Sequence, residues 1–413
     1  MSISLKFTIM KTERFVEMKR FMRLFNARLQ QNDMLLHSTT VGSENFKESY
    51  TKNFLAVCQY VAAVNKSGLP ALVNPVPAWE EFSTLLVEAK AATLEWTNSV
   101  AVNLQSLPHS ILRKNGEMTK LFDEAIQLCE KLIENPRSSR IEELHDTIDD
   151  LLRNIESINS RLTDLLSLLE DYHDSLPVQA EKLQNLADKS LMAKEVDEKK
   201  VKELKLLVTK AKAEISSLSA AIAGMSVAIA ASILISVVAV ATAGPVGCLS
   251  FVFTGIVMGT SIAYIVMDAK KIEALKDQIS QTQNSMDDYT ADVAALQLLA
   301  DGFNDLAKQA ADMEGSVKFI VRAWEAMRND LQVINSEVKH AQDLWAEQEW
   351  AAMKQDFEEA AILWKQFIEK AGLYDLDNVK ACNCILELGM SEEDVKAAVE
   401  KNGTIDLIDY LTA

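Results

Sequence analysis

The chain has 413 residues, of which 25% are charged and 48% are apolar, as is usual for a soluble protein. It carries 42 basic against 60 acidic residues, a net charge of −18. This balance argues against a nucleic-acid surface, because phosphate binding needs clustered Lys and Arg. Bulk electrostatics would not draw such a protein to an anionic membrane either, so any membrane affinity must come from apolar burial or from a specific receptor.

Residues 1–116 form the predicted N-terminal helical region, with helical spacing over 10–36, 45–66 and 79–106. Prolines at 70, 75 and 77 predict a loop between the second and third of these segments, and Leu107-Pro108-His109 predicts a turn after the third. Charged residues interrupt the first 20 positions. This stretch therefore has neither the continuous apolar run nor the small-residue cleavage site of a secretory signal peptide. We therefore expect a soluble protein that is secreted or released without a classical signal peptide.

Residues 117–214 are predicted to form stalk helices. From Ile141 to Tyr172 the apolar residues alternate in steps of three and four, which is the repeat of coiled-coil packing. Asn135-Pro136 predicts a turn before this stripe, and Pro177 allows a break or kink after it. A second stripe, from Val201 to Leu218, leads into the next segment without a linker.

Residues 215–267 contain no Asp, Glu, Lys or Arg. A membrane-spanning helix needs roughly 20 mostly apolar residues, so this segment is long enough for two crossings. Gly244, Pro245 and Gly247 lie between its two halves, where a helix must stop and reverse. The segment is therefore predicted to be a membrane-inserting helical hairpin with these three residues at its tip. The other residues predicted to enter the membrane are Leu218, Ile222, Val227, Ile229, Ile233, Val238, Phe251, Phe253, Ile256, Ile262 and Val266.

Small residues in this segment also suggest a helix–helix contact. Gly255 and Gly259 form a GxxxG pair, and such spacing lets helices approach closely in lipid. In a segment so rich in small residues, this spacing arises by chance about as often as it marks a contact. A helix contact and a chance spacing are therefore both open interpretations.

Residues 268–370 are predicted to form a long stalk helix and its return, and residues 371–413 a short C-terminal helical cap. An apolar stripe in steps of three and four runs from Ile272 to Val338, and no proline follows Pro245. The last residues, ILELGMSEEDVKAAVEKNGTIDLIDYL, faintly resemble a ubiquitin-associated three-helix domain. We favour a plain helical cap, because the resemblance rests on common helix-turn features.

The sequence offers little that could support catalysis or cofactor binding. The five histidines are scattered, and no phosphate-binding glycine loop or nucleophile elbow is present. Cys382 and Cys384 have no second cysteine pair with metal-ligand spacing. We therefore expect no enzyme activity, no catalytic residues, no cofactor and no metal site.

Three readings of the apolar segment compete. It can fold against the helices in a soluble state and insert into a target membrane, it can be a permanent two-pass anchor of a coiled-coil scaffold, or it can be the buried centre of a large soluble protein. The third is the weakest, since buried helices rarely run so far without a charge. We favour the first over the second, because no basic cluster flanks the segment and its many Ala, Gly and Ser residues keep it only moderately hydrophobic.

Long heptad-patterned helices that run directly into and out of a central apolar hairpin resemble the α-helical pore-forming toxins. These include cytolysin A, the haemolysin BL and non-haemolytic enterotoxin proteins, the Xax/Yax cytotoxins and the helical insecticidal crystal proteins. The resemblance covers residues 117 to 350 and lies in layout. It implies a soluble protein that inserts its apolar head into a target-cell lipid membrane and forms a homo-oligomer, with a second toxin component as a further partner. The predicted fold is thus all-α, an elongated antiparallel bundle of long coiled-coil helices with an apolar helical hairpin head.

Overall fold

The computed structural model describes residues 43–66, 79–190, 238–242, 248–258, 288–376, 379–386 and 404–412, with a few single positions between 199 and 285. The helices in these ranges are α2 (Ser43–Lys66), α3 (Trp79–Glu95), the π-helix η1 (Trp96–Ala101), α4 (Val102–Glu134), α5 (Ser138–Ser190), α8 (Asp288–Asp343), η2 (Leu344–Glu347), α9 (Trp350–Ala371), η3 (Gly372–Tyr374) and α11 (Leu407–Thr412). The strands are β1 (Val238–Thr242), β2 (Cys248–Met258), β3 (Val379–Leu386) and β4 (Thr404–Asp406). None of the described helices combines the length and the apolar character that a membrane crossing requires.

The chain divides into two compact units, each assembled from separate segments. One, here called the four-helix unit, takes its described helices mainly from Ile111–Ser160 and Glu325–Leu373. The other, here called the sheet unit, is built from Tyr50–Ser110, Arg161–Trp324 and Tyr374–Ala413. Parts of α2, α4, α5, α8 and η3 belong to each unit.

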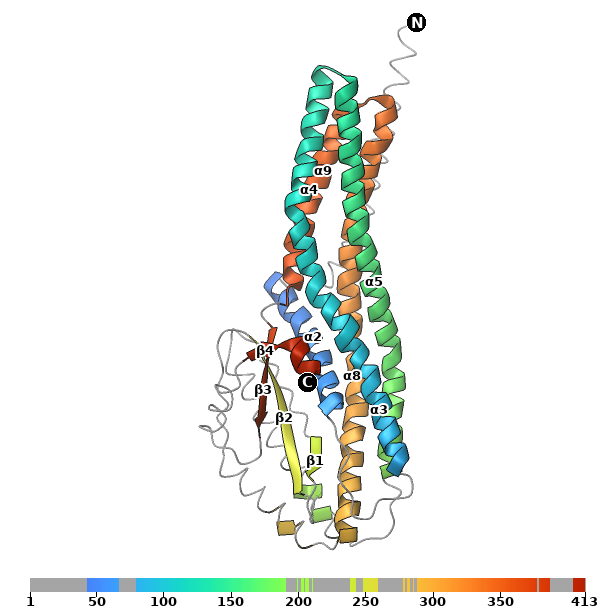
Figure 1. Cartoon of the computed structure of the whole chain (residues 1–413), viewed down its shortest axis with the longest axis vertical. Helices are drawn as coiled ribbons and strands as arrows, with labels where there is room; N and C mark the ends of the chain where they lie inside the picture. Colours follow the sequence, from blue (N-terminus) through green and yellow to red (C-terminus); the bar gives the residue numbers. More distant parts are fainter. Residues whose placement is uncertain are drawn as a thin grey trace. The chain divides into compact units, whose positions relative to one another are not determined.

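In the four-helix unit, α4, α5, α8 and α9 are antiparallel to their neighbours in sequence (Figure 1). Residues 135–137 join α4 to α5, and the Arg140 guanidinium donates hydrogen bonds to the carbonyls of Lys131 (2.9 Å) and Asn135 (3.1 Å). The Lys131 carbonyl also accepts a hydrogen bond from the Asn135 amide (3.0 Å), so Arg140 adds a side-chain cap to the end of α4. The predicted turn at Asn135-Pro136 is confirmed.

The predicted coiled-coil stripes form the core of these helices. On α5 the stripe positions 144, 148, 151, 155, 158, 162, 165, 169 and 172 are buried, and on α8 so are positions 303, 306, 310, 317, 320, 324, 327, 331, 334 and 338. The two helices have 53 and 56 residues, so each spans about 80 Å at 1.5 Å per residue. The prediction of a bundle of long heptad-patterned helices is confirmed.

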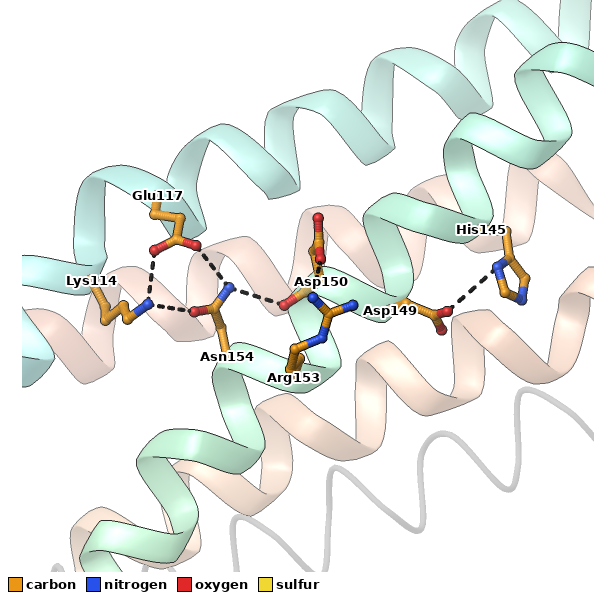
Figure 2. A network of polar contacts seen from close by, with 7 residues as sticks. All are labelled: Lys114, Glu117, His145, Asp149, Asp150, Arg153 and Asn154. Atoms are coloured by element: carbon orange, nitrogen blue, oxygen red, sulfur yellow. Dashed lines mark hydrogen bonds and ion pairs between the residues drawn. The ribbon is translucent and has the colours of Figure 1, made fainter.

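A polar network joins α4 to α5 beside this core (Figure 2). The Lys114 ammonium donates hydrogen bonds to Glu117 (2.9 Å) and to the Asn154 side-chain carbonyl (2.8 Å). The Asn154 amide donates to Glu117 (3.1 Å) and to the Asp150 backbone carbonyl (3.0 Å). The bond from Lys114, followed by that from Asn154, lowers the pKa of Glu117 below its ordinary value of 4.5.

Two prolines lie inside helices, where the sequence predicts a turn at Pro108 and allows a break or kink at Pro177. α4 continues through Pro108 and α5 through Pro177, so the prediction of a turn at 107–109 is wrong. Proline removes one helical hydrogen bond, but Leu104, Leu107 and Ile111 around Pro108 are all buried. Burial of this apolar face outweighs the local cost of the proline.

The predicted helical hairpin is wrong where the structure describes it, because β1 and β2 are strands. They lie in a four-stranded sheet of order β1-β2-β3-β4 with every neighbouring pair antiparallel. β2 is rich in β-branched and aromatic residues, which favour strands, and it has a distant strand to pair with. A short continuous apolar run cannot be assigned to helix or strand by its spacing alone, and this ambiguity accounts for the error.

The predicted all-helical C-terminal cap is also wrong in part. After α9 and η3 the described residues form β3 and β4, and only then the short helix α11. Thr404 follows Asn402-Gly403, a dipeptide typical of turns beside strands. The protein is therefore helical in its bundle and carries one small sheet, formed by the apolar segment together with the C-terminal segment.

Candidate functional site

The candidate site is the sheet of strands β1 to β4, here called the head sheet. Two of its strands come from the charge-free segment 215–267, and the other two come from the last 35 positions of the chain. Figure 1 shows these strands in order, with β2 as the longest. The most apolar part of the sequence is thus held by backbone pairing to a segment that follows it far along the chain.

β1 and β2 form an antiparallel pair in which Val238 is opposite Val252 and Thr242 is opposite Cys248. The two strands therefore run in opposite directions, and the predicted turn residues Gly244 and Pro245 lie outside the described residues. This part of the register involves only Cys248–Val252 of β2.

The second half of β2 pairs with β3. Phe253 is opposite Leu386, Gly255 opposite Cys382 and Met258 opposite Val379, with a register irregularity between Phe253 and Gly255. Glycine inside a strand commonly accompanies such an irregularity, because it has no side chain to hold the regular pleat. Among the described strands, β3 is the one that pairs with positions 253–258.

The C-terminal segment is fixed in the sheet unit by its two ends. At its start the Val379 amide donates a hydrogen bond to the Leu376 carbonyl (2.9 Å), and both side chains are buried. At its end α11 follows β4 directly and packs against β3, β4 and η1, with Leu407 and Leu411 buried. β3 and β4 are therefore held between two buried anchors.

Asn65 on α2 connects the second anchor to two other helices. Its side-chain amide donates to the Leu411 carbonyl (3.5 Å), and its side-chain carbonyl accepts a hydrogen bond from the Thr93 hydroxyl on α3 (2.6 Å). One amide side chain thus links α2, α3 and α11.

A buried aromatic cluster lies at the first anchor. Tyr374 packs against Tyr50 and Trp324 with ring centroids 5.0 and 4.9 Å apart. The Tyr374 hydroxyl donates to the Ala323 carbonyl (2.8 Å), and the Trp324 indole donates to the Tyr50 hydroxyl (3.0 Å). Burial raises the pKa of Tyr50 well above its ordinary value, so the phenol stays neutral and acts as a hydrogen-bonding group.

A second aromatic cluster lies around Trp96 in η1. Its ring packs against Tyr172 (5.0 Å between centroids) and Phe54 (6.0 Å), and its indole N–H donates to the Cys58 sulfur (3.5 Å). Burial raises the pKa of the Cys58 thiol to about 12, so this cysteine is not a reactive thiolate at neutral pH.

The structure places five of the predicted site residues in strands. Val238 begins β1, and Phe251, Phe253, Gly255 and Ile256 lie in β2. The helix contact predicted for Gly255 and Gly259 is not present in this conformation, because Gly255 belongs to a strand opposite Cys382. It stays a prediction for a membrane-inserted form. The following predicted residues lie outside the described residues: Leu218, Ile222, Val227, Ile229, Ile233, Gly244, Pro245, Gly247, Gly259, Ile262 and Val266.

Sequence reasoning did not predict β3 as the pairing partner of the apolar segment, nor β4 and α11, which pack on β3. The signals available were the Asn402-Gly403 turn and the apolar positions from Val379 to Leu386. In the part of the chain that the structure describes, no group of three or more His, Cys, Asp or Glu side chains could hold a metal ion.

No protein-family model matches the sequence, and no curated protein matches it either. The structure is similar to solved structures of α-pore-forming toxins. AhlB of the tripartite α-pore-forming toxin from Aeromonas hydrophila is 12% identical, with a TM-score of 0.43 over 90% of this chain and 100% of AhlB. The cytotoxin MakB from Vibrio cholerae is 14% identical, with a TM-score of 0.43 over 80% of this chain and 91% of MakB. XaxA from Xenorhabdus nematophila is 12% identical, with a TM-score of 0.44 over 78% of this chain and 94% of XaxA. The likeness is one of structure at low sequence identity.

Proposed function

We propose that this protein permeabilises a target-cell lipid membrane by inserting the apolar segment 215–267. The observation that carries the proposal is that this segment is long enough for two crossings and has no charged residue. Because it carries no charge over this length, the segment is suited to hydrocarbon, and in the described residues its strand β2 pairs with β3.

Apolar burial supplies the driving force in this proposal. Transfer of apolar surface from water is worth roughly 25 cal/mol per Å², and no charge in the segment opposes it. The net charge of −18 rules out general electrostatic attraction to anionic lipid as the cause. Insertion requires the head sheet to come apart, because open strand edges leave backbone groups without partners in hydrocarbon, whereas a helix satisfies its own.

The proposal extends to assembly on the membrane. Two crossings from one chain enclose no water-filled path, so permeabilisation requires several copies. We propose a homo-oligomer, with a second toxin component as a partner if the purified protein alone is inactive. The proposed inserted residues are those named above from Leu218 to Val266, with Gly244, Pro245 and Gly247 at the tip that leads across.

Dye release from liposomes tests the proposal. The Val238→Asp variant introduces a charge into the apolar segment, which costs about 2.5 to 3.5 kcal/mol at the centre of a membrane-spanning helix, so release should be abolished. Val178→Asp is the matched control, because Val178 is 52% exposed on α5 and lies outside the apolar segment. Far-UV circular dichroism checks that both variants keep their helices. Undiminished release by Val238→Asp would rule out insertion of this segment.

The same proteins separate the proposal from a permanent two-pass scaffold. A scaffold would need detergent for its extraction, whereas a protein that inserts on contact purifies from the aqueous fraction. If the wild-type protein releases no dye, the assay is repeated on whole cells with candidate second components before the function is rejected.

A further inference from the structure

We propose that the C-terminal strands β3 (Val379–Leu386) and β4 (Thr404–Asp406), together with α11 (Leu407–Thr412), act as an intramolecular clasp. It holds strand β2 in the head sheet, and its detachment is the step that frees the apolar segment. The inference rests on the proposed function for what the freed segment does, but the clasp itself is a property of the fold and can be tested without a membrane.

The pairing pattern of β2 is the first argument. The β1 register involves positions 248–252 of β2, and the β3 register involves positions 253–258. β1 belongs to the same apolar segment as β2, so its pairing would move with that segment. The described strand that joins the segment to the rest of the protein is β3.

The anchoring of the clasp is the second argument. β3 follows the buried cluster of Tyr50, Trp324 and Tyr374, and β4 leads into α11, where Leu407 and Leu411 are buried. Asn65 adds a hydrogen bond from α2 to the end of α11. Both ends of the clasp are therefore tied to helices, while β3 between them pairs with β2 of the apolar segment.

The third argument is that the two anchors of the clasp, the Tyr374 cluster and α11, differ in size. The Tyr374 anchor consists of large, buried, hydrogen-bonded aromatic rings, whereas α11 has only six residues and contributes two buried leucines. A helix this short is not stable on its own and depends on its packing. We infer that the clasp opens from its α11 end and stays attached at Tyr374.

A reversible cross-link between β2 and β3 tests the clasp. Gly255 lies opposite Cys382, and opposite residues in antiparallel strands have Cα atoms about 4.5 to 5.5 Å apart, within the range that a disulfide bridges. The Gly255→Cys variant should therefore form a disulfide with Cys382 when treated with oxidised glutathione. Because an irregularity adjoins this pair, the double variant Ile256→Cys/Ala381→Cys places a second cross-link at the next register position.

The native cysteines allow a matched control. Cys58 and Cys129 are buried, and burial raises the pKa of both thiols to about 12, so they contribute little thiolate to the exchange. The variant Gly255→Cys/Cys382→Ser carries the same new cysteine without its partner. Peptide mapping by mass spectrometry identifies the bonded pair.

Two readouts follow for each protein. In dye release, the cross-linked variant should be at least about tenfold slower than the same variant after reduction with dithiothreitol, and the control should not respond to oxidation. In hydrogen exchange without vesicles, the amides of Phe253–Met258 should exchange more slowly in the cross-linked protein. They should exchange faster in Leu407→Ala/Leu411→Ala, which removes packing from the α11 anchor.

The outcomes distinguish the clasp from the proposed function. Full dye release by the cross-linked protein overturns the clasp while leaving insertion intact. Failure of both cross-links to form overturns the β2–β3 pairing on which the clasp depends. If no protein releases dye, hydrogen exchange still decides: unchanged exchange of β2 in Leu407→Ala/Leu411→Ala overturns the clasp, and faster exchange supports it independently of membrane activity.

Discussion

Ion pairs at partly exposed positions occur inside both units, for instance Lys182 to Glu88 (3.1 Å) in the sheet unit, whereas the sheet unit also has hydrogen bonds between buried side chains. In the four-helix unit, charged groups at partly exposed positions link the helices, as in Lys354 to Glu130 (2.8 Å) and Lys370 to Asp330 (2.7 Å). In the sheet unit, neutral groups form buried hydrogen bonds, as in Trp324 to Tyr50 and Tyr60 to Gln179 (3.0 Å each).

This difference has consequences for stability. Exposed ion pairs contribute little individually and weaken with salt, so the four-helix unit depends on its repeated apolar stripe. A buried hydrogen bond that loses one partner leaves a desolvated group behind. Single substitutions should therefore damage the sheet unit more than the four-helix unit, and the sheet unit is the one that holds the apolar strands.

The largest effect should come from Trp96→Ala in the sheet unit. Truncating a buried tryptophan costs about 3 to 5 kcal/mol of unfolding free energy, and Trp96 is fully buried between Phe54 and Tyr172. Urea unfolding followed by circular dichroism measures the loss. The control is Trp345→Ala in the four-helix unit, since Trp345 is only partly buried beside His145 and Trp350. Equal losses of unfolding free energy in the two variants would contradict the greater sensitivity expected of the sheet unit.

A smaller effect should follow from Tyr50→Phe. The Trp324 indole N–H would lose its acceptor at a buried position, at a cost of about 1 to 3 kcal/mol. Thr97→Val is the matched control, because the Thr97 hydroxyl is buried and has no hydrogen-bond partner among the described residues. Removing that hydroxyl should leave the unfolding free energy unchanged or raise it. A loss in Thr97→Val as large as in Tyr50→Phe would show that the hydrogen bond is not the cause.

The smallest effect should come from Lys114→Met in the four-helix unit. This variant removes an exposed ion pair, so the loss should stay below about 1 kcal/mol and shrink in high salt. The pKa of Glu117 lies below 4.5 in the folded protein because of its bonds to Lys114 and Asn154. Its contribution is therefore present at neutral pH and is lost as the pH falls below about 4.5 through the folded pKa. Urea unfolding at pH 7 and pH 3 should show that the variant loses less stability on acidification than the wild type.

The sequence by itself determined the long helices. Stripes such as Leu144 to Tyr172 place apolar residues three and four positions apart, and these neighbours meet on one face of a helix whatever the rest of the chain does. Local signals likewise predicted the turn at Asn135-Pro136, which lies between α4 and α5. The turn predicted from Pro108 is wrong, because burial of Leu104, Leu107 and Ile111 keeps the helix intact there.

Only the tertiary structure decided that the described parts of the apolar segment are strands. The spacing of apolar residues in a run such as Cys248–Met258 does not distinguish a buried helix from a buried strand, although its β-branched and aromatic residues favour a strand. The choice depends on a partner, and that partner is β3, in which Val379 lies opposite Met258. Backbone hydrogen bonds join peptide groups that every residue carries. Pairing between strands so far apart in the chain therefore produces no periodic pattern of residue types in either strand.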